Sequence, residues 1–272
     1  MDSRPILFID SGIGGLPYCL DFRSKNPIEK VCYLADNQNF PYGPRKKDEL
    51  ASILITLTEI LLNKINPKII VLACNTATIS ALAVLRQQYP QIPFVGTVPA
   101  LKPAAKTTNS GKVGVLGTAR TIEEIRSLEL VDESCDIHGI AAPELVEFVE
   151  NHFEKADENE KKEIVKKYID IFRLEGVDSL VLGCTHFLFL QNEFRKEGAN
   201  PDYSGHIEVF DSLEGITKRI EFLLDENEEL LRAENISFPV HQLLITQKDQ
   251  QLSFWKNRAI TLGFKLDLLN EL

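Results

Sequence analysis

The sequence predicts an α/β fold made of two similar parallel-sheet domains. Short apolar runs alternate with longer amphipathic stretches, several of those runs are apolar throughout, and one distinctive pattern occurs twice. The chain has 272 residues, which is enough for two modest domains with cores of their own. We expect residues 1–98 together with 208–272 to form the first domain, and residues 99–207 to form the second.

The strand candidates are short, and most are uniformly apolar rather than alternating. Uniform runs are typical of strands that are buried on both faces, as in parallel sheets that carry helices on either side. In chain order the candidates are Ile6–Ile9, Val31–Leu34, Ile69–Ala73, Phe94–Val95, Val113–Leu116, Leu180–Leu182, Ile207–Phe210 and Gln242–Ile245.

The segments between the strands predict helices. Asp48–Asn63 and Thr76–Gln88 carry apolar residues at helical spacing, and a proline follows each of them closely. Glu160–Leu174 has the same spacing and is followed by Gly176, a residue that commonly ends helices. A strand, helix, strand, helix order indicates parallel strands that are joined by helical crossovers.

An internal repeat relates the two halves of the chain. Ile69–Ala73 leads into Cys74, and Leu180–Gly183 leads into Cys184, each followed by hydroxyl or amide residues. Leu7–Gly12 resembles Val113–Thr118 at nearly the same separation. We therefore expect two domains that are related by pseudo-symmetry, with a ligand cleft between them at the carboxyl ends of the strands. Residues expected at those ends are Asp10, Ser11, Cys74, Thr118 and Cys184.

The two cysteines in matched positions predict acid–base chemistry at a carbon with two faces. Each follows a strand and precedes an expected helix, and a helix N-terminus stabilises a thiolate. Two thiols on opposite sides of one ligand suit the movement of a proton across a stereocentre. The alternative is that Cys74 and Cys184 are simply small buried hydrophobic residues.

Three further residues could assist the thiols or bind a ligand. Asp10 ends an apolar run and could relay a proton, or it could cap the helix that follows. His186 lies two residues after Cys184 and could exchange protons with its thiol. Phe40–Pro44 is a rigid aromatic turn in which the Tyr42 hydroxyl could bind a carboxylate, or it could be an ordinary loop.

Composition and charge argue against several other classes. The net charge of −10, with no basic stripe, argues against nucleic acid as a partner, and the apolar runs are too short to span a membrane. The sequence starts without a signal-peptide pattern, and five cysteines argue against a disulfide framework. We expect no metal, because Cys184 and His186 lack companion zinc ligands, and no dinucleotide, because Pro17 occupies the third glycine position of G-x-G-x-x-G.

Taken together, these motifs resemble the glutamate racemases of the aspartate/glutamate racemase superfamily. The resemblance covers nearly the whole chain and rests on residues 10–16, 40–43, 73–78, 113–118 and 182–186. It implies interconversion of L-glutamate and D-glutamate without a cofactor or metal. It also implies a cytoplasmic enzyme that supplies D-glutamate for peptidoglycan, with a small-molecule substrate and a possible homodimer.

The resemblance also implies roles for particular residues. Cys74 and Cys184 would be the two acid/base thiols, with Asp10 supporting the first and His186 supporting the second. The residues that would contact the substrate are Asp10, Ser11, Tyr42, Gly43, Asn75, Thr76, Thr118, Thr121, Thr185 and His186.

An acidic residue of the second half would assist as well. Glu150 matches the family position best and Glu147 is the weaker candidate, although both could be ordinary charges on an amphipathic helix. Phe187–Leu188, Leu213 and Ala141 depart from residues that are common in the family. None of these departures removes a proposed catalytic group.

Three alternative functions remain open on the sequence. A sister racemase or isomerase acting on aspartate, a hydantoin or maleate would also use two cysteines. A non-catalytic regulatory protein on the same fold would bind an amino acid without exchanging its Cα proton. A thiol redox protein would form a disulfide between Cys74 and Cys184.

Overall fold

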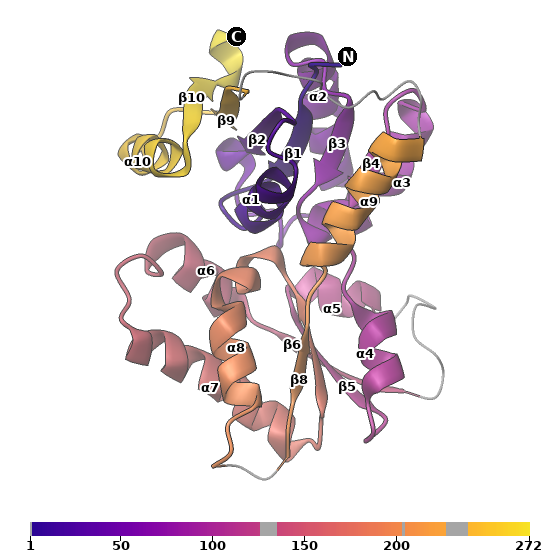
Figure 1. Cartoon of the computed structure of the whole chain (residues 1–272), viewed down its shortest axis with the longest axis vertical. Helices are drawn as coiled ribbons and strands as arrows, with labels where there is room; N and C mark the ends of the chain where they lie inside the picture. Colours follow the sequence, from indigo (N-terminus) through magenta and orange to yellow (C-terminus); the bar gives the residue numbers. More distant parts are fainter. Residues whose placement is uncertain (1, 126–134, 203–204, 227–238) are drawn as a thin grey trace. The chain divides into compact units, whose positions relative to one another are not determined.

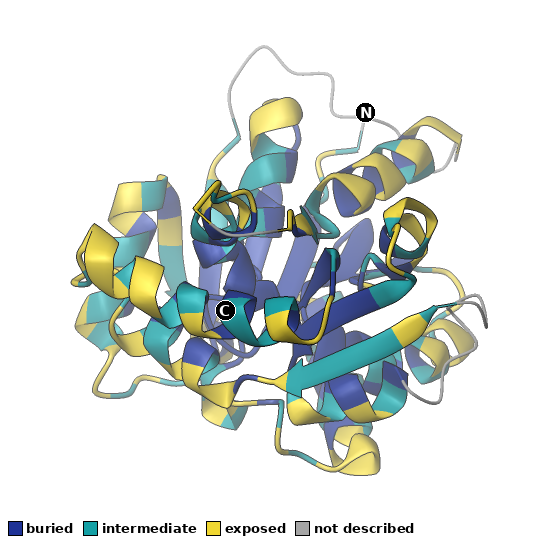
Figure 2. Cartoon of the chain, turned by 90° about the horizontal axis from the view of Figure 1, so that it is seen from below, coloured by how far each residue is buried: buried dark blue, intermediate teal, exposed yellow. Residues whose placement is uncertain are grey.

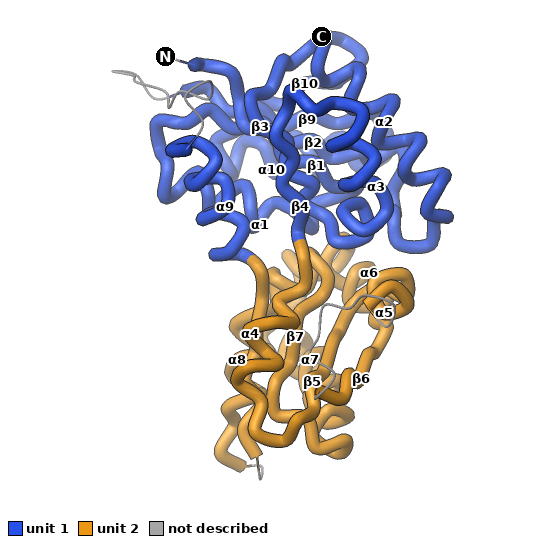
Figure 3. Tube along the Cα trace, turned by 90° about the vertical axis from the view of Figure 1, so that its right-hand side faces the viewer, with its two compact units in different colours: residues 1–97, 213–272 blue, residues 98–212 orange. Residues whose placement is uncertain are grey.

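The computed structural model describes residues 2–125, 135–202, 205–226 and 239–272, and the chain divides into two compact units. Unit 1 comprises Met1–Thr97 and Leu213–Leu272, and unit 2 comprises Val98–Ser212 (Figure 3). Each unit contains a sheet of parallel strands and several helices, so the predicted α/β fold class is confirmed. Residues 208–212, which we expected in the first domain, belong to unit 2 because a strand within them pairs with the second sheet.

Unit 1 is built on a six-stranded parallel sheet with the order β10-β9-β2-β1-β3-β4 (Figure 1). Its strands are β1 (Ile6–Asp10), β2 (Val31–Ala35), β3 (Ile69–Leu72), β4 (Phe94–Gly96), β9 (His241–Ile245) and β10 (Phe264–Leu268). Every residue of β1, β2 and β3 is buried, which explains why their sequences are uniformly apolar. Figure 2 shows buried strands surrounded by helices whose outer sides are exposed.

Helices cover both faces of the unit 1 sheet. They are α1 (Leu16–Lys25), α2 (Lys47–Lys64), α3 (Asn75–Gln88), α9 (Leu213–Glu226) and α10 (Leu252–Leu262), with short 3₁₀ turns η1 (Asn37–Asn39) and η3 (Leu269–Glu271). Apolar residues of α2 and α3 form one core with Leu7 and Ile9 of β1. On the opposite face the ring of Phe8 lies 6.1 Å from that of Phe22 in α1, because side chains alternate along a strand.

Gly15 allows α1 to begin directly against β1 and β3. A Cβ at this position would lie 2.7 Å from both the Cβ and the carbonyl oxygen of Ala73, and 3.1 Å from the Cβ of Asp10. Both of those neighbours belong to the sheet and its loops, so they cannot move away as a flexible side chain could.

We therefore expect Gly15→Ala to lower the free energy of unfolding by about 1–3 kcal/mol, the usual cost of overpacking a core. Urea unfolding of the wild type and the variant would measure the change. Gly215→Ala is a matched control, because a Cβ at that exposed position in α9 would meet nothing within 4 Å. An unchanged urea midpoint for Gly15→Ala would contradict the close packing of α1.

Unit 2 is built on a four-stranded parallel sheet with the order β6-β5-β7-β8. Its strands are β5 (Lys112–Gly117), β6 (Asp136–Ala141), β7 (Ser179–Gly183) and β8 (Glu208–Phe210). Its helices are α4 (Leu101–Thr107), α5 (Ala119–Ile125), α6 (Pro143–Asn151), α7 (Glu158–Leu174), α8 (Gln191–Gly198) and the 3₁₀ helix η2 (Thr185–Leu190). Residues of α4 and α5 pack with Val113 and Val115, whereas Phe172 of α7 lies against Gly114 on the other face.

The two sheets share one strand order, as the internal sequence repeat predicts. The order β2-β1-β3-β4 in unit 1 corresponds to β6-β5-β7-β8 in unit 2. In each sheet the first strand lies between the second and the third: β1 lies between β2 and β3, and β5 lies between β6 and β7. The connections from these strands therefore run in opposite directions, which makes a topological switch point. Cys74 follows β3 and Cys184 follows β7, so each cysteine lies at the switch point of its own sheet.

Within the described ranges, none of the helices combines the length and the continuous hydrophobicity that a membrane-spanning segment needs.

Candidate active site

Cys74 occupies the junction between β3 and α3. It is the N-cap residue of α3 and is 8% exposed. Its carbonyl oxygen accepts a hydrogen bond of 2.9 Å from the Thr78 backbone, within the first turn of the helix. Asn75 and Thr76 open the helix and are both buried. The helix N-terminus provides partial positive charge near the thiol, as the sequence predicts.

Asp10 ends β1, the strand that pairs with β3. Its side chain is fully buried, and its Oδ1 accepts hydrogen bonds from the Ser11 backbone nitrogen at 2.5 Å and the Ser11 hydroxyl at 3.3 Å. Helix α1 has Gly15 at its N-cap and no side-chain cap hydrogen bond, so Asp10 does not cap it. The register of β1 and β3 continues toward Ser11 and Cys74, which brings this carboxylate to the same edge of the sheet as the thiol.

Tyr42 brings a phenol to this end of unit 1, and Asp36 holds it in place. The Tyr42 ring is buried, and its hydroxyl donates a hydrogen bond of 2.8 Å to Asp36 Oδ2. Asp36 directly follows β2 and is fully buried. Its carboxylate also accepts hydrogen bonds from Asn39 Nδ2 at 2.9 and 3.1 Å and from the Thr246 hydroxyl at 2.9 Å.

The environment of Tyr42 keeps its hydroxyl protonated. Burial raises the pKa of Tyr42 well above its ordinary value of 10.0, and the charge and hydrogen bond of Asp36 raise it further. The charges of Cys74 and Asp10 contribute as well, which puts both groups within electrostatic reach of the phenol. Gly43, half-buried, follows directly in the chain. Tyr42 is therefore available as a neutral hydrogen-bonding group at the Cys74 edge.

Sequence reasoning did not find Asp36 or Thr246. Asp36 ends an apolar strand in the same way as Asp10, so a signal for it was present in the sequence. Thr246 is 210 residues away in the chain from the carboxylate that it contacts, and no local pattern reveals such a pair.

In unit 2, Cys184, His186 and Glu150 form a hydrogen-bonded chain. Cys184 Sγ lies 3.7 Å from His186 Nδ1, and His186 Nε2 lies 2.7 Å from Glu150 Oε1. The side chains of His186 and Glu150 are 6% and 7% exposed, and Cys184 is buried. Cys184 is the N-cap residue of η2, so the helix that we expected after it begins as a 3₁₀ helix. The arrangement follows catalytic triads, in which a third group orients the acid–base residue.

The pKa of His186 is raised well above its ordinary value of 6.5. Burial lowers it, but the hydrogen bonds to Cys184 and Glu150 and the charges of these groups together outweigh burial. The protonated ring can donate from Nε2 to Glu150 and from Nδ1 to the sulfur of Cys184. His186 is therefore a cationic partner for a thiolate and a proton source beside it.

The two acidic candidates on α6 differ clearly in position. Glu150 contacts His186, as described, whereas Glu147 is exposed. The geometry therefore favours Glu150 as the assisting acid.

Three threonines bring hydroxyl groups to the same end of unit 2. Thr118 follows β5, and its hydroxyl accepts a hydrogen bond of 3.2 Å from the Thr121 backbone nitrogen at the start of α5. The Thr118 and Thr121 hydroxyls lie 3.0 Å apart. Gly117 pairs with Gly183, so Thr118 and Cys184 follow paired positions. Thr121 and Thr185 are buried.

The expected site residues thus form two groups, which we call half-site 1 and half-site 2. Half-site 1 is Asp10, Ser11, Tyr42, Gly43, Cys74, Asn75 and Thr76, and half-site 2 is Thr118, Thr121, Glu150, Cys184, Thr185 and His186. None of the five cysteines, which all lie in the described residues, takes part in a disulfide. The described residues include no cluster of three or more His, Cys, Asp or Glu arranged to hold a metal ion.

The chain is similar to known racemases in sequence and in fold. The family model described as Asp/Glu/Hydantoin racemase matches residues 26–215. The glutamate racemase of Bartonella tribocorum is 37% identical over 85% of this chain and 84% of its own length, and that of Ectopseudomonas mendocina is 35% identical over 94% and 90%. Escherichia coli glutamate racemase, crystallised with L-glutamate and the activator UDP-MurNAc-ala, superposes with a TM-score of 0.82 at 27% identity over 97% of both chains. The chain therefore belongs to the Asp/Glu/Hydantoin racemase family, within the glutamate racemases.

Proposed function

We propose that this enzyme interconverts L-glutamate and D-glutamate by a two-thiol mechanism that needs no cofactor. Cys74 and Cys184 act at opposite faces of the substrate Cα. In one direction a thiolate removes the Cα proton, and the opposite thiol then donates its proton to the other face. In the reverse direction the two sulfurs exchange roles.

The single observation that best supports this proposal is the equivalent placement of the two cysteines. Each follows the strand beside the first strand of its sheet. The buried carboxylate of Asp10 shares the sheet edge of Cys74, and the His186–Glu150 pair adjoins Cys184. Asp10 supports Cys74, and His186, oriented by Glu150, supports Cys184. A redox protein or a binding protein would not need separate proton-handling groups beside each thiol.

The remaining residues supply donors for the charged groups of glutamate. A Cα proton is weakly acidic, so its removal needs hydrogen bonds to the carboxylate, where negative charge develops. Neutral hydroxyls and amides suit this role because they can donate without attracting the proton themselves. We assign it to Ser11, Asn75, Thr76, Thr118, Thr121, Thr185 and the Gly43 backbone N–H. The Tyr42 hydroxyl donates its proton to Asp36, so we assign it the role of accepting from the ammonium group of the substrate.

Proton NMR in D₂O tests this function directly. The purified protein, treated with a chelator, is incubated with L-glutamate or D-glutamate, and the Cα–H signal and the enantiomer ratio are followed. We expect the signal to disappear and both reactions to reach a racemic mixture. Unchanged spectra would overturn the assignment. Aspartate and a hydantoin are tested in parallel. Selective turnover of either compound would show that it, and not glutamate, is the substrate.

We further propose that the D-glutamate product serves peptidoglycan synthesis in the cytoplasm, and that the enzyme can form a homodimer. The first point is supported by the muramyl nucleotide that activates the Escherichia coli relative. Light scattering of the purified protein would test the oligomeric state.

A further inference from the structure

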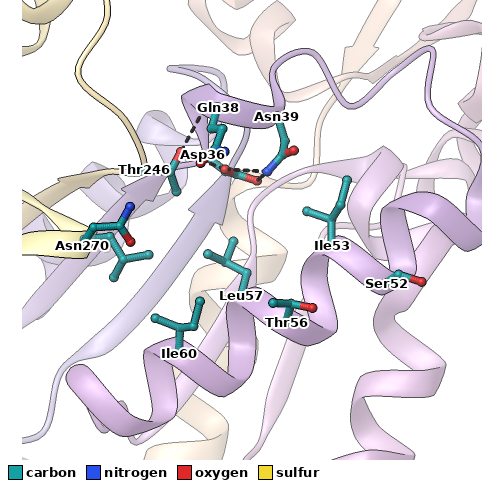
Figure 4. Close-up of a pocket in the computed structure, with 11 residues that line it drawn as sticks. Asp36, Gln38, Asn39, Ser52, Ile53, Thr56, Leu57, Ile60, Thr246 and Asn270 are labelled. Atoms are coloured by element: carbon teal, nitrogen blue, oxygen red, sulfur yellow. Dashed lines mark hydrogen bonds between the residues drawn. The ribbon is translucent and has the colours of Figure 1, made fainter.

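A pocket lies within unit 1, and Asp36 is one of the residues that line it. Its volume is about 350 Å³, within the range of small-molecule sites. Figure 4 shows its two contrasting sides. Ile53, Leu57 and Ile60 of α2 form an apolar wall, and Asp36 and Thr246 lie at a polar end.

The polar end of this pocket carries an unusual electrostatic feature. Of the eleven residues that line the pocket, all of them described, Asp36 alone has a formal charge. Its side-chain donors in the described structure are the hydroxyls of Tyr42 and Thr246 and the amide of Asn39, all of them neutral. A fully buried carboxylate held only by neutral dipoles projects a negative potential into the adjoining space.

The geometry points to this pocket as a binding site for a small organic cation with an apolar body. The cationic end would approach Asp36, and the apolar body would pack on Ile53, Leu57 and Ile60. An anion such as glutamate itself is disfavoured, because no positively charged residue lines the pocket to offset Asp36. Exposed polar groups at the rim, including Gln38 and Asn270, can bind the remaining donors and acceptors of the ligand.

A ligand at this position acts on half-site 1 through Asp36. One carboxylate oxygen accepts from Thr246 at the pocket, and the other accepts from the Tyr42 hydroxyl. A cation that draws the carboxylate toward the pocket weakens its hold on the phenol, and the Tyr42 oxygen is then less well oriented to accept from the ammonium group of the substrate. This coupling rests on the proposed function, whereas the binding site itself does not.

Benzamidine is a suitable probe, because it combines a flat ring with a planar cation that matches a carboxylate. Benzamide and benzoate keep the same ring and are neutral and anionic controls. Ligand-observed NMR titration of the full chain would measure binding. We expect saturable binding of benzamidine and at least about tenfold weaker binding of benzoate. Equal binding of the two ligands would overturn the electrostatic basis of the site.

Thr56→Trp tests the location of binding. Thr56 is an exposed residue of α2 that lines the pocket, so an indole there fills the cavity without disturbing the core. Asn63→Trp is the matched control, because Asn63 is exposed on the same helix but does not line the pocket. We expect benzamidine binding to be lost in the first variant and kept in the second. Retained binding by Thr56→Trp would place the probe elsewhere and overturn the proposal.

A kinetic measurement tests the coupling separately. Saturating benzamidine should raise KM for glutamate in the wild type and leave it unchanged in Thr56→Trp. An unchanged wild-type KM would refute the link through Asp36 while leaving the binding site intact. A protein that bound benzamidine at this pocket but did not turn over glutamate would refute the proposed function and not the site.

Discussion

Cys74→Ser and Cys184→Ser should each lower kcat/KM for glutamate by about a thousandfold or more, the upper part of the range for loss of general acid–base catalysis. A serine hydroxyl is far less acidic than a thiol. At neutral pH it therefore forms almost no alkoxide that could take up a Cα proton, and it is too weak an acid to return one. L-glutamate and D-glutamate are equally stable in solution, and kcat/KM must therefore fall by the same factor in both directions. Polarimetry starting from each enantiomer would measure both values.

Deuterium incorporation distinguishes the two thiols even where racemisation is lost. A variant that keeps one thiol can still remove the Cα proton from the face that this thiol reaches. With no acid on the opposite side, the same sulfur returns a proton, so the carbon exchanges without inverting. We therefore expect slow Cα–H exchange in D₂O, with Cys74→Ser and Cys184→Ser acting on opposite enantiomers.

Cys135→Ser is the matched control for both variants. Cys135 is half-buried, and its sulfur lies 3.7 Å from the carbonyl oxygen of Ala105, away from both half-sites. The Cys135→Ser variant should racemise glutamate at the wild-type rate. Full racemisation by either Cys74→Ser or Cys184→Ser would contradict the two-thiol mechanism. Exchange of the same enantiomer by both would contradict the proposal that the two thiols act on opposite faces of the substrate.

Most of the strands that the sequence predicts lie inside a sheet, although two of them, β4 and β8, lie at a sheet edge. All eight candidates correspond to strands of the structure, because uniform apolar runs have few other stable arrangements. Asp136–Ala141 and Phe264–Leu268 were not predicted, and these form β6 and β10, the edge strands at the other side of each sheet. An edge strand exposes part of its surface, so polar residues such as His138 interrupt its apolar pattern.

The site residues that belong to short sequence motifs could be predicted from the sequence. Those that are identified only by their tertiary contacts could not. Cys74, Cys184 and His186 lie in short recognisable segments at strand ends. The choice between Glu147 and Glu150 required the structure, because both lie on one helix and only their contacts separate them. The strand orders that create the two switch points also come from long-range pairing, which no local pattern encodes.

Glu150→Gln should lower kcat/KM by about a hundredfold, within the range for loss of a group that supports acid–base catalysis. Gln keeps the shape of the side chain but removes the charge that faces His186 Nε2 at 2.7 Å. The imidazolium loses an anionic partner, so its pKa falls from its raised value. Glu147→Gln is the control on the same helix, and because Glu147 is exposed we expect wild-type activity.

Histidine NMR titration gives a readout that a merely structural role of Glu150 would not move. In the wild type, the His186 ring should stay protonated well above its ordinary pKa of 6.5, whereas His241, whose pKa burial lowers to about 4, should be neutral. The His186 signal is assigned by its absence in His186→Asn. In Glu150→Gln the His186 midpoint should move to lower pH. An unmoved midpoint would show that Glu150 does not control the protonation of this ring.

The raised pKa of His186 also predicts how the free energy of unfolding depends on pH. A pKa that is higher in the folded than in the unfolded protein stabilises the fold fully below the unfolded value of 6.5, and this contribution is lost as pH rises through the folded pKa. For each pKa unit by which Glu150→Gln lowers the pKa of His186 in the folded protein, the free energy of unfolding at acidic pH falls by about 1.4 kcal/mol. Urea unfolding from about pH 6 to about pH 9 should therefore show the variant weakened most near pH 6, with the difference narrowing as pH rises. A difference that widened with pH would mean that Glu150 disfavours the charged ring, and His186 could not then serve as the proton source beside Cys184.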